Sequence, residues 1–501
     1  MDSLPVFDEV YVISDIHMGG RPGFQILRHG DRLGRFIEHL GSVRPDERVA
    51  LVLNGDVIDS LAEEIHGYVA TREAVSMMER IYQSFAPVWE GLASFIRRPR
   101  RHLVWVTGNH DIELSLPEVE HSIRRRIAGD DPSLNGALTF ATKGAGYACY
   151  VGDKRVFCTH GNEVDDWNVV DYGRLGELGN ALNAGRDIDH CKWSPNAGTR
   201  LVVDVMNRVK QRYPFVDLLK PETKVVVPIL LVLDPGLARH IDAESAFGVA
   251  WGKIKGRFVT RGLLGAEDED PSAVRDPIDA AELALDELLG AHLHGVVAGG
   301  GAGADPDALL LEAEAVVRGE PPAARISEHE GTLGWFGMAV DRLRGVDKVE
   351  ALRNALLDWL EKDESFDIRN RDETFERITP RVDPKVDIIV TGHTHLERAI
   401  PLGDRRWYYN CGTWIRLIRF TEAMLQSREK FETVMAALEQ GSMQALDDAK
   451  LEGQPLVLDH AAAVRIAKEP QGVRAELLRV RDDANNGIVL DPVPNTEFRK
   501  P

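Results

Sequence analysis

The chain has few cysteines and no excess of basic residues. Its 501 residues include four cysteines, which form no Cys-x-x-Cys pair and lie at Cys149, Cys158, Cys191 and Cys411. This spacing predicts neither a disulfide framework nor a thiolate zinc site. Lysine and arginine number 60 against 80 acidic residues, a formal net charge of −20. A protein that mainly grips a phosphate backbone needs a basic surface, so nucleic acid is the less favoured partner.

Long apolar runs and an apolar amino-terminal segment are also missing. The longest apolar run, residues 225–233, contains Pro228, whereas a membrane-spanning helix needs about 20 apolar residues. The chain opens Met1-Asp2-Ser3-Leu4-Pro5, without the basic and apolar regions of a secretory signal. We therefore expect a cytoplasmic protein with no membrane span. With 44% apolar residues the chain can bury a large core, and its length allows about three domains.

Short apolar runs alternate with longer amphipathic stretches at both ends of the chain. The predicted strands lie at 10–13, 49–53, 102–106, 386–390, 407–414, 461–466 and 473–480. A helix is predicted at 24–40, a long helical region at about 71–97 and a helical stretch at 421–438. Gly152-Asp153 separates runs 147–151 and 154–158, a pattern that predicts a β-hairpin. This alternation is typical of an α/β layer fold.

Residues 166–380 show a different, mainly helical pattern broken by glycine and proline. We interpret this stretch as an insertion between two parts of one core, 1–165 and 381–501. One helix is predicted at 346–360, where apolar residues recur at helical spacing. Because the insertion leaves and returns between ligand-bearing blocks, part of it is expected to overhang the site as a lid.

The insertion is polarised in charge. Residues 200–261 hold eleven basic and six acidic residues, a local +5, and 262–320 hold two basic and fourteen acidic residues, a local −12. The acidic stretch contains a glycine-rich loop at 299–303. The basic residues either meet an anionic substrate or form a solvated helix face. They are Arg200, Arg208, Lys210, Arg212, Lys253, Lys255, Arg257 and Arg261.

Five blocks share one arrangement, in which a short apolar strand ends and the next residues supply oxygen or imidazole groups. They are Ser14-Asp15-Ile16-His17, Asn54-Gly55-Asp56, Thr107-Gly108-Asn109-His110-Asp111, Thr159-His160-Gly161 and Thr391-Gly392-His393-Thr394-His395. Ligands of open α/β sheets bind beyond the carboxyl ends of the strands, so these loops are expected to converge on one rim. The adjacent glycines allow tight turns and close approach.

The candidate ligands offer more lone pairs than one divalent ion can use. They also have too little counter-charge for a site that holds no ion. They are Asp15, His17, Asp56, Asn109, His160, His393 and His395. Two metals fit better, and Asp56 is the best candidate to bridge ions about 3.5–4 Å apart. Such a pair polarises a phosphoryl oxygen and generates hydroxide near neutral pH. Ligands of this kind, without thiolates, favour Mn, Fe or Zn over Mg.

The blocks and their order resemble the calcineurin-like metallophosphoesterase superfamily. The motifs that carry the resemblance are Asp15-x-His17, Gly55-Asp56, Gly108-Asn109-His110-Asp111, His160 and Gly392-His393-x-His395. The resemblance covers about 1–165 and 381–480. It implies a four-layer α/β sandwich, two central mixed β-sheets flanked by helices, with the large insertion unexplained.

The resemblance also implies a role for each residue. One metal would be held by Asp15, His17, Asp56 and His395, and the other by Asp56, Asn109, His160 and His393. His110 would stabilise the transition state and protonate the leaving oxygen, with Asp111 orienting its imidazole. The implied reaction is hydrolysis of a phosphate mono- or diester, on a small molecule or nucleotide, by attack of metal-bound hydroxide.

Other functions stay open. They are a nuclease or a nucleotide-sugar pyrophosphatase of the same superfamily, and a non-enzymatic scaffold protein with a structural metal site. A phosphoprotein phosphatase is disfavoured, because Ser60 and Leu61 follow Asp59 where that group usually has Arg-Gly, and Asp111 follows His110 where it has Glu. No oligomeric state is predicted.

Several neighbouring residues have two interpretations. Asp59 either holds His17 or the loop, or caps a turn. Asp165 and Asp166 either meet the substrate or cap a helix. His160 either binds metal or donates to a backbone carbonyl. Asn410 is expected to support the ligand loops, and His292-x-His294, with no strand before it, is interpreted as a non-site.

Overall fold

The computed structural model describes residues 4–500 except 64–68, 167, 187–192, 221–228, 230–346, 361–362, 404, 484 and 486. Several sequence predictions lie outside the described residues. They concern Cys191, most of the apolar run 225–233, Lys253, Lys255, Arg257, Arg261, His292, His294 and the loop 299–303. Within the described part of the chain, no helix is long and apolar enough to cross a bilayer.

The chain folds as two compact units. The first comprises Met1–Thr199, Glu364–Arg416 and Asp459–Pro501, and the second Arg200–Asp363 and Leu417–Leu458. These boundaries differ from the predicted 1–165, 166–380 and 381–501, because the segment 417–458 folds with the insertion. All five ligand-bearing blocks belong to the first unit.

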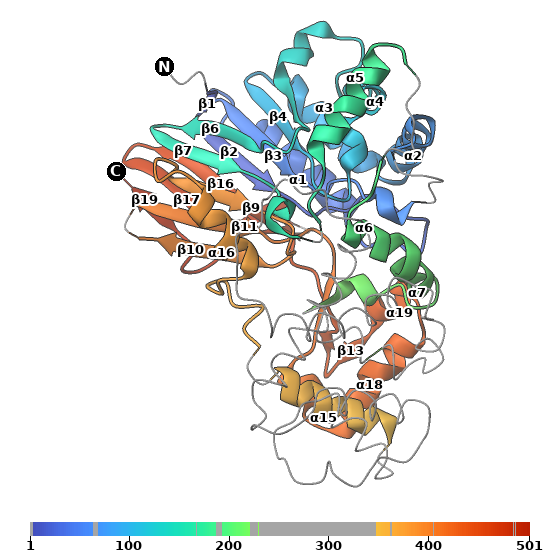
Figure 1. The fold of residues 1–501 in the computed structure, drawn as a ribbon. Coiled ribbons are helices and arrows are strands. Elements are labelled where there is room, and N and C mark those ends of the chain that lie inside the picture. Colours follow the sequence, from blue (N-terminus) through green and yellow to red (C-terminus); the bar gives the residue numbers. More distant parts are fainter. Residues whose placement is uncertain are drawn as a thin grey trace, which may run out of the picture. The chain divides into compact units, whose positions relative to one another are not determined.

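An eight-stranded mixed sheet forms half of the first unit's centre (Figure 1). Its strands are β2 (Glu9–Ile13), β3 (Val49–Asn54), β4 (Arg101–Val106), β5 (Leu138–Ala141), β16 (Ala462–Glu469), β17 (Gly472–Asp483), β18 (Gly487–Pro492) and β19 (Phe498–Lys500). The order is β18-β17-β16-β2-β3-β4-β5, with β19 also paired to β17. Strands β2 to β5 run parallel, and β16 joins β2 antiparallel.

A six-stranded mixed sheet forms the other half. Its strands are β1 (Val6–Phe7), β6 (Tyr147–Val151), β7 (Lys154–Cys158), β9 (Ile388–Thr391), β10 (Glu397–Leu402) and β11 (Arg406–Cys411). The order is β1-β6-β7-β9-β11-β10, and β7, β9 and β11 are mutually parallel. The predicted hairpin is confirmed as β6 and β7, at the predicted bounds.

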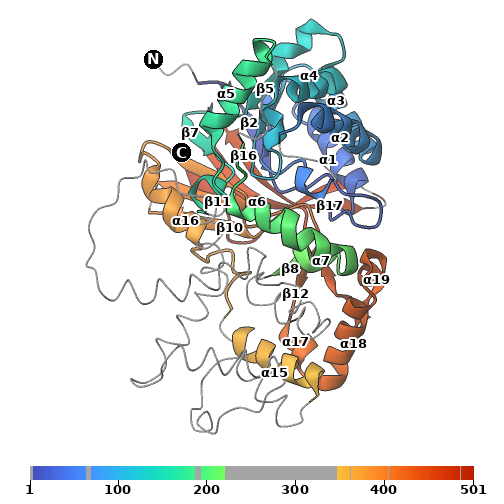
Figure 2. The same cartoon turned by 45° about the vertical axis from the view of Figure 1, so that its right-hand side comes forward.

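The two sheets pack face to face. Successive strand residues point to opposite sides, so each central strand contributes to a core on either face of its sheet. Val12, Val52 and Val104 share the core between the sheets with Cys149, Cys158, Ile388 and Cys411. Tyr11, Leu51 and Leu103 face the other way and pack with the helices of the first unit. A third cluster covers the outer face of the six-stranded sheet, where Phe375 and Ile378 of α16 meet Tyr408. Figure 2 shows α16 beside β10 and β11. The predicted four-layer α/β sandwich is therefore confirmed.

The helices of the first unit are α1 (Gly30–Ser42), α2 (Thr71–Ser84), α3 (Ala86–Arg97), α4 (Pro117–Ala128), α5 (Tyr172–Asn183) and α16 (Glu373–Ile378). Its 3₁₀ turns are η1 (Ser60–Ala62), η2 (Ile112–Ser115), η3 (Pro132–Ala137), η4 (Asn162–Val164) and η9 (Thr379–Arg381). The predicted helical region 71–97 is confirmed, as two helices that are separated at Phe85. Pro87 lacks the N–H donor that would continue the hydrogen bonds of α2, and it stands in the first turn of α3, where that donor is not needed.

The described part of the second unit is mostly helical. Its helices are α6 (Ala197–Leu201, which spans the unit boundary), a π-helical turn (Val202–Met206), α7 (Asn207–Arg212), η7 (Val216–Leu218), α15 (Lys348–Leu360), α17 (Glu422–Leu425), α18 (Arg428–Glu439) and α19 (Met443–Asp448). Its strands are β8 (Leu219–Lys220), β12 (Leu417–Arg419), β13 (Lys450–Leu451), β14 (Gln454–Pro455) and β15 (Val457–Leu458). The helix predicted at 346–360 is confirmed as α15. The helical stretch predicted at 421–438 is observed as α17 and α18, since Ser427 caps a new start at α18.

Candidate metal centre

The ligand-bearing loops lie at the carboxyl ends of parallel strands from both sheets. Asp15, Asp56 and Asn109 follow β2, β3 and β4 of the eight-stranded sheet. His160 and His393 follow β7 and β9 of the six-stranded sheet. The predicted single rim is therefore built from two facing sheets, and hydrogen bonds join its halves. Asn54 Nδ2 donates to the Thr159 carbonyl at 2.9 Å, and the His393 N–H donates to the Asp15 carboxylate at 3.0 Å.

One group of side chains that can bind a metal is formed by Asp15, His17 and His395. The Nε2 atoms of His17 and His395 lie 3.1 Å apart, and His395 Nε2 lies 3.3 Å from Asp15 Oδ1. Asp56 Oδ2 lies 3.9 Å from His17 Nε2. Two imidazole nitrogens that face each other with carboxylates around them present lone pairs to a common point, as metal ligands do.

A second group is formed by Asp56, His160 and His393. His160 Nδ1 donates to the Asn54 carbonyl at 2.9 Å, so Nε2 is the acceptor nitrogen in the neutral ring, the form that binds a metal. That Nε2 lies 3.1 Å from Asp56 Oδ2, yet it is buried without a hydrogen-bond partner. The Oδ1 atom of Asn109 is likewise buried and unpartnered. Orphaned acceptors are costly inside a protein unless a ligand pairs with them, so these residues fit a bound cation.

The ligand residues have unusual backbone conformations. Among the described residues, ten non-glycine residues have a positive φ, and five of them are candidate ligands: Asp15, His17, Asp56, His393 and His395, with φ between 50° and 73°. Left-handed backbone is uncommon for non-glycine residues and concentrates at functional sites. The conformations therefore point to this rim independently of the motifs.

Two glycines make room for the carboxylates. A Cβ at Gly108 would lie 2.2 Å from Asp56 Oδ1, and a Cβ at Gly392 would lie 2.5 Å from Asp15 Oδ2. Any larger residue at either position would displace a candidate ligand. The glycines flanking the ligands are thus required by close approach, as the sequence predicts.

Asp59 contacts the His110 imidazole at Nδ1. His110 Nδ1 lies 3.0 Å from Asp59 Oδ1, and His17 Nδ1 lies 3.5 Å from Asp59 Oδ2. Asp111 instead accepts hydrogen bonds from the backbone N–H groups of Gly108 and Val57, at 2.6 and 2.9 Å. This differs from the role that the resemblance implies for Asp111, because its carboxylate serves to hold the loops rather than the imidazole. His17, Asp59 and His110 form a third metal-capable group.

The site concentrates negative charge. Burial raises the pKa of Asp15 and Asp56, but nearby imidazoles outweigh this, so the pKa of Asp15 is about 2 and that of Asp56 lies well below its usual value. Burial lowers the pKa of His160, yet the charges of Asp56 and Asp15 raise it to about 10. The carboxylates thus draw a proton onto a buried imidazole. A metal cation supplies the same charge and replaces such protons when it binds.

Three of the remaining candidate residues support loops or lie at the surface. Asp59, besides its imidazole contacts, accepts a hydrogen bond from the Ala62 N–H and caps η1. Asn410 Nδ2 donates to the Gly392 carbonyl at 2.6 Å, so it supports a ligand loop as predicted. Asp166 pairs with Arg377 at 3.0 Å, with its side chain 62% exposed.

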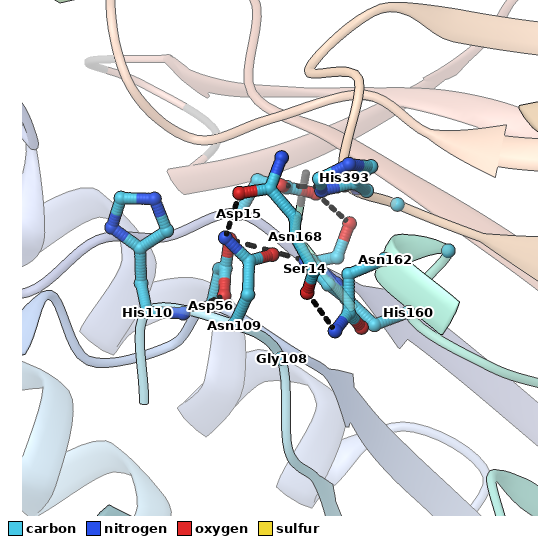
Figure 3. Close-up of polar contacts among 12 residues, drawn as sticks. Ser14, Asp15, Asp56, Gly108, Asn109, His110, His160, Asn162, Asn168 and His393 are labelled. Carbon is cyan, nitrogen blue, oxygen red and sulfur yellow. Dashed lines mark hydrogen bonds and ion pairs between the residues drawn. The ribbon is translucent and has the colours of Figure 1, made fainter. Parts of the chain in front are cut away.

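Asp165 and Asn168 contact the candidate ligands directly, and Figure 3 shows Asn168 beside Asn109. Asp165 Oδ2 lies 2.7 Å from His393 Nε2, and Asn168 Oδ1 lies 3.4 Å from Asn109 Nδ2. Asn168 has no signal in the sequence beyond its place eight residues after His160, because the contact depends on a turn at 165–168.

A comparison with known families agrees with this geometry. Residues 9–218 match the family model of the calcineurin-like phosphoesterases. Residues 9–218, which contain four of the five ligand-bearing blocks, are therefore similar to the metallophosphoesterase superfamily, as the motifs predict. No curated protein matches the chain.

Proposed function

We propose that this protein is a binuclear metal-dependent phosphoesterase that hydrolyses phosphate mono- or diesters. The observation that carries the proposal is the position of Asp56 between the two ligand groups. Its Oδ2 atom lies 3.9 Å from His17 Nε2 and 3.1 Å from His160 Nε2. One carboxylate within reach of both groups is what a bridged pair of ions requires.

The residues present divide into two ligand sets that share Asp56. The first set is Asp15, His17, Asp56 and His395, and the second is Asp56, Asn109, His160 and His393. Their imidazole, carboxylate and amide groups suit Mn, Fe or Zn. When bound, the ions polarise the phosphoryl oxygens and lower the pKa of coordinated water.

His110 supplies the proton for the leaving oxygen. Its side chain is 20% exposed, whereas Asp59 is 4% exposed, so the imidazole is the reachable member of the pair. Burial raises the pKa of Asp59, but His110 and His17 outweigh this and hold it well below its usual value. The ionised carboxylate therefore fixes the proton on Nδ1 and stabilises the imidazolium, whose Nε2 proton passes to the leaving group.

The substrate class follows from charge. A formal net charge of −20 disfavours a polymer with many phosphates, so we propose a small-molecule or nucleotide phosphate ester. The cytoplasmic location stays a prediction from the sequence.

The test compares two variants on mono- and bis(p-nitrophenyl) phosphate with added Mn²⁺. His110→Ala is expected to lower kcat about 10²–10⁴-fold with two ions still bound, because it removes only proton transfer. Asp56→Ala is expected to lose both metal and activity. Two bound ions without hydrolysis of either ester by the unaltered chain would favour a scaffold protein, and full turnover by His110→Ala would refute the mechanism.

A further inference from the structure

Asp165 holds one ligand of the second set by its outer nitrogen. Asp165 Oδ2 lies 2.7 Å from His393 Nε2, and the histidine side chain is 11% exposed. An ionised carboxylate only accepts hydrogen bonds, so Nε2 carries the proton in this contact. The other ring nitrogen, Nδ1, is then the one with a lone pair for a cation. The contact selects both the tautomer and the orientation of the ring.

Asn168 holds a second ligand of the same set. Its Oδ1 lies 3.4 Å from Asn109 Nδ2, and its Nδ2 donates to Asp165 Oδ2 at 2.7 Å. Because the Asn109 amide nitrogen is turned toward Asn168, its Oδ1 faces away, and this is the buried oxygen that lacks a partner. Asn168 therefore connects the two ligands through Asp165.

The segment that carries these contacts is itself held in place. The Asn168 N–H donates to the Asp165 carbonyl at 3.0 Å, which closes the turn. Asn162 Nδ2 donates to the Asn168 carbonyl, also at 3.0 Å. The segment begins five residues after His160, a third ligand of the second set. One stretch of chain thus supplies one ligand and orients two others.

We propose that Asp165 and Asn168 are positioning residues that set the affinity of the second metal site, separately from the first. The proposal rests on the proposed function, since it needs a metal at Asp56, Asn109, His160 and His393. The ligands that Asp165 and Asn168 orient belong to this set, whereas Asp15, His17 and His395 belong to the other. Loss of such an orienting contact typically weakens metal affinity 10–100-fold.

The experiment measures Mn²⁺ binding by the full chain, stripped of metal, by calorimetry and electron paramagnetic resonance without substrate. Asp165→Ala is made in a His17→Ala background, which disables the first site, and in a His160→Ala background, which disables the second. We expect Asp165→Ala to weaken the remaining affinity 10–100-fold in the first background and to leave it unchanged in the second. Asn168→Ala should act in the same direction.

Asp166→Ala is the matched control, since it removes the adjacent acid, which pairs with Arg377. It should bind Mn²⁺ like the unaltered chain. The proposal would be overturned if Asp165→Ala weakened Mn²⁺ affinity equally in both backgrounds, or in neither. The proposed function would still stand in that case, provided that the unaltered chain binds two ions. If the unaltered chain binds no Mn²⁺, both proposals fail. If Asp165→Ala does not fold, the Mn²⁺ affinity of Asp165→Asn is measured in the same two backgrounds and judged by the same criteria.

Discussion

The substitution Gly108→Ala tests the close packing around Asp56 with a single methyl group. The added Cβ would lie 2.2 Å from Asp56 Oδ1 and 2.6 Å from the Asp56 backbone nitrogen. Ordinary contacts begin near 3.4 Å, so the overlap exceeds 1 Å. Gly108 does not have a positive φ, so alanine is compatible with the backbone there. Any effect of the substitution is therefore expected from the steric overlap with Asp56.

Asp56 has little freedom to yield. Its Oδ1 accepts the His110 N–H at 2.8 Å, and its carbonyl accepts the N–H groups of Ile16 and His17 at 2.9 Å. Overpacking of this kind costs about 1–3 kcal/mol of unfolding free energy. A shift of about 1 Å in the shared carboxylate should also lower kcat about 10²-fold and weaken metal binding.

The assay combines urea unfolding, metal content and ester hydrolysis. Gly136→Ala is the control, because Gly136 has no atom within 4 Å of an added Cβ and also lacks a positive φ. It should unfold within about 0.5 kcal/mol of the unaltered chain and keep full activity. If Gly108→Ala keeps both ions and full turnover, the packing argument for Asp56 is refuted.

Two further predictions concern pH and metal removal. Burial raises the pKa of Asp459, but hydrogen bonds from His29 and Arg32 outweigh this and lower it to about 2. The folded pKa is depressed, so the carboxylate contributes about 2 kcal/mol above its ordinary pKa near 3.8 and loses this as pH falls toward 2. The difference in urea midpoint between the unaltered chain and Asp459→Asn should therefore narrow from pH 7 to pH 3, and a difference that widens would contradict the pairing. Metal removal by a chelator should lower the melting temperature, and Mn²⁺ at about 100 times its Kd should restore about 2.7 kcal/mol. The Asp56→Ala variant should not respond, and an unaltered chain that melts identically with and without Mn²⁺ would argue against any metal site.

Local patterns were sufficient for much of the core. The hairpin of β6 and β7 was predicted at its observed bounds, because Gly152-Asp153 forms the turn and the flanking runs alternate in burial. Strand β10 was not predicted, since Glu397, Arg398 and Pro401 interrupt its apolar pattern. Its strand conformation depends on pairing with β11, and the residues of β10 do not predict that pairing.

The candidate ligands could be identified along the chain because each follows a strand and stands next to a glycine or two residues from another ligand. Their orienting partners could not be identified in this way. Asp59 lies 51 residues from His110, and Asp165 lies 228 residues from His393. A short motif records which atoms are available for coordination, whereas the hydrogen bond that aims each atom depends on how two sheets bring distant loops together. The sequence was therefore enough to name the candidate ligands, and only the folded chain decided which acid holds which imidazole.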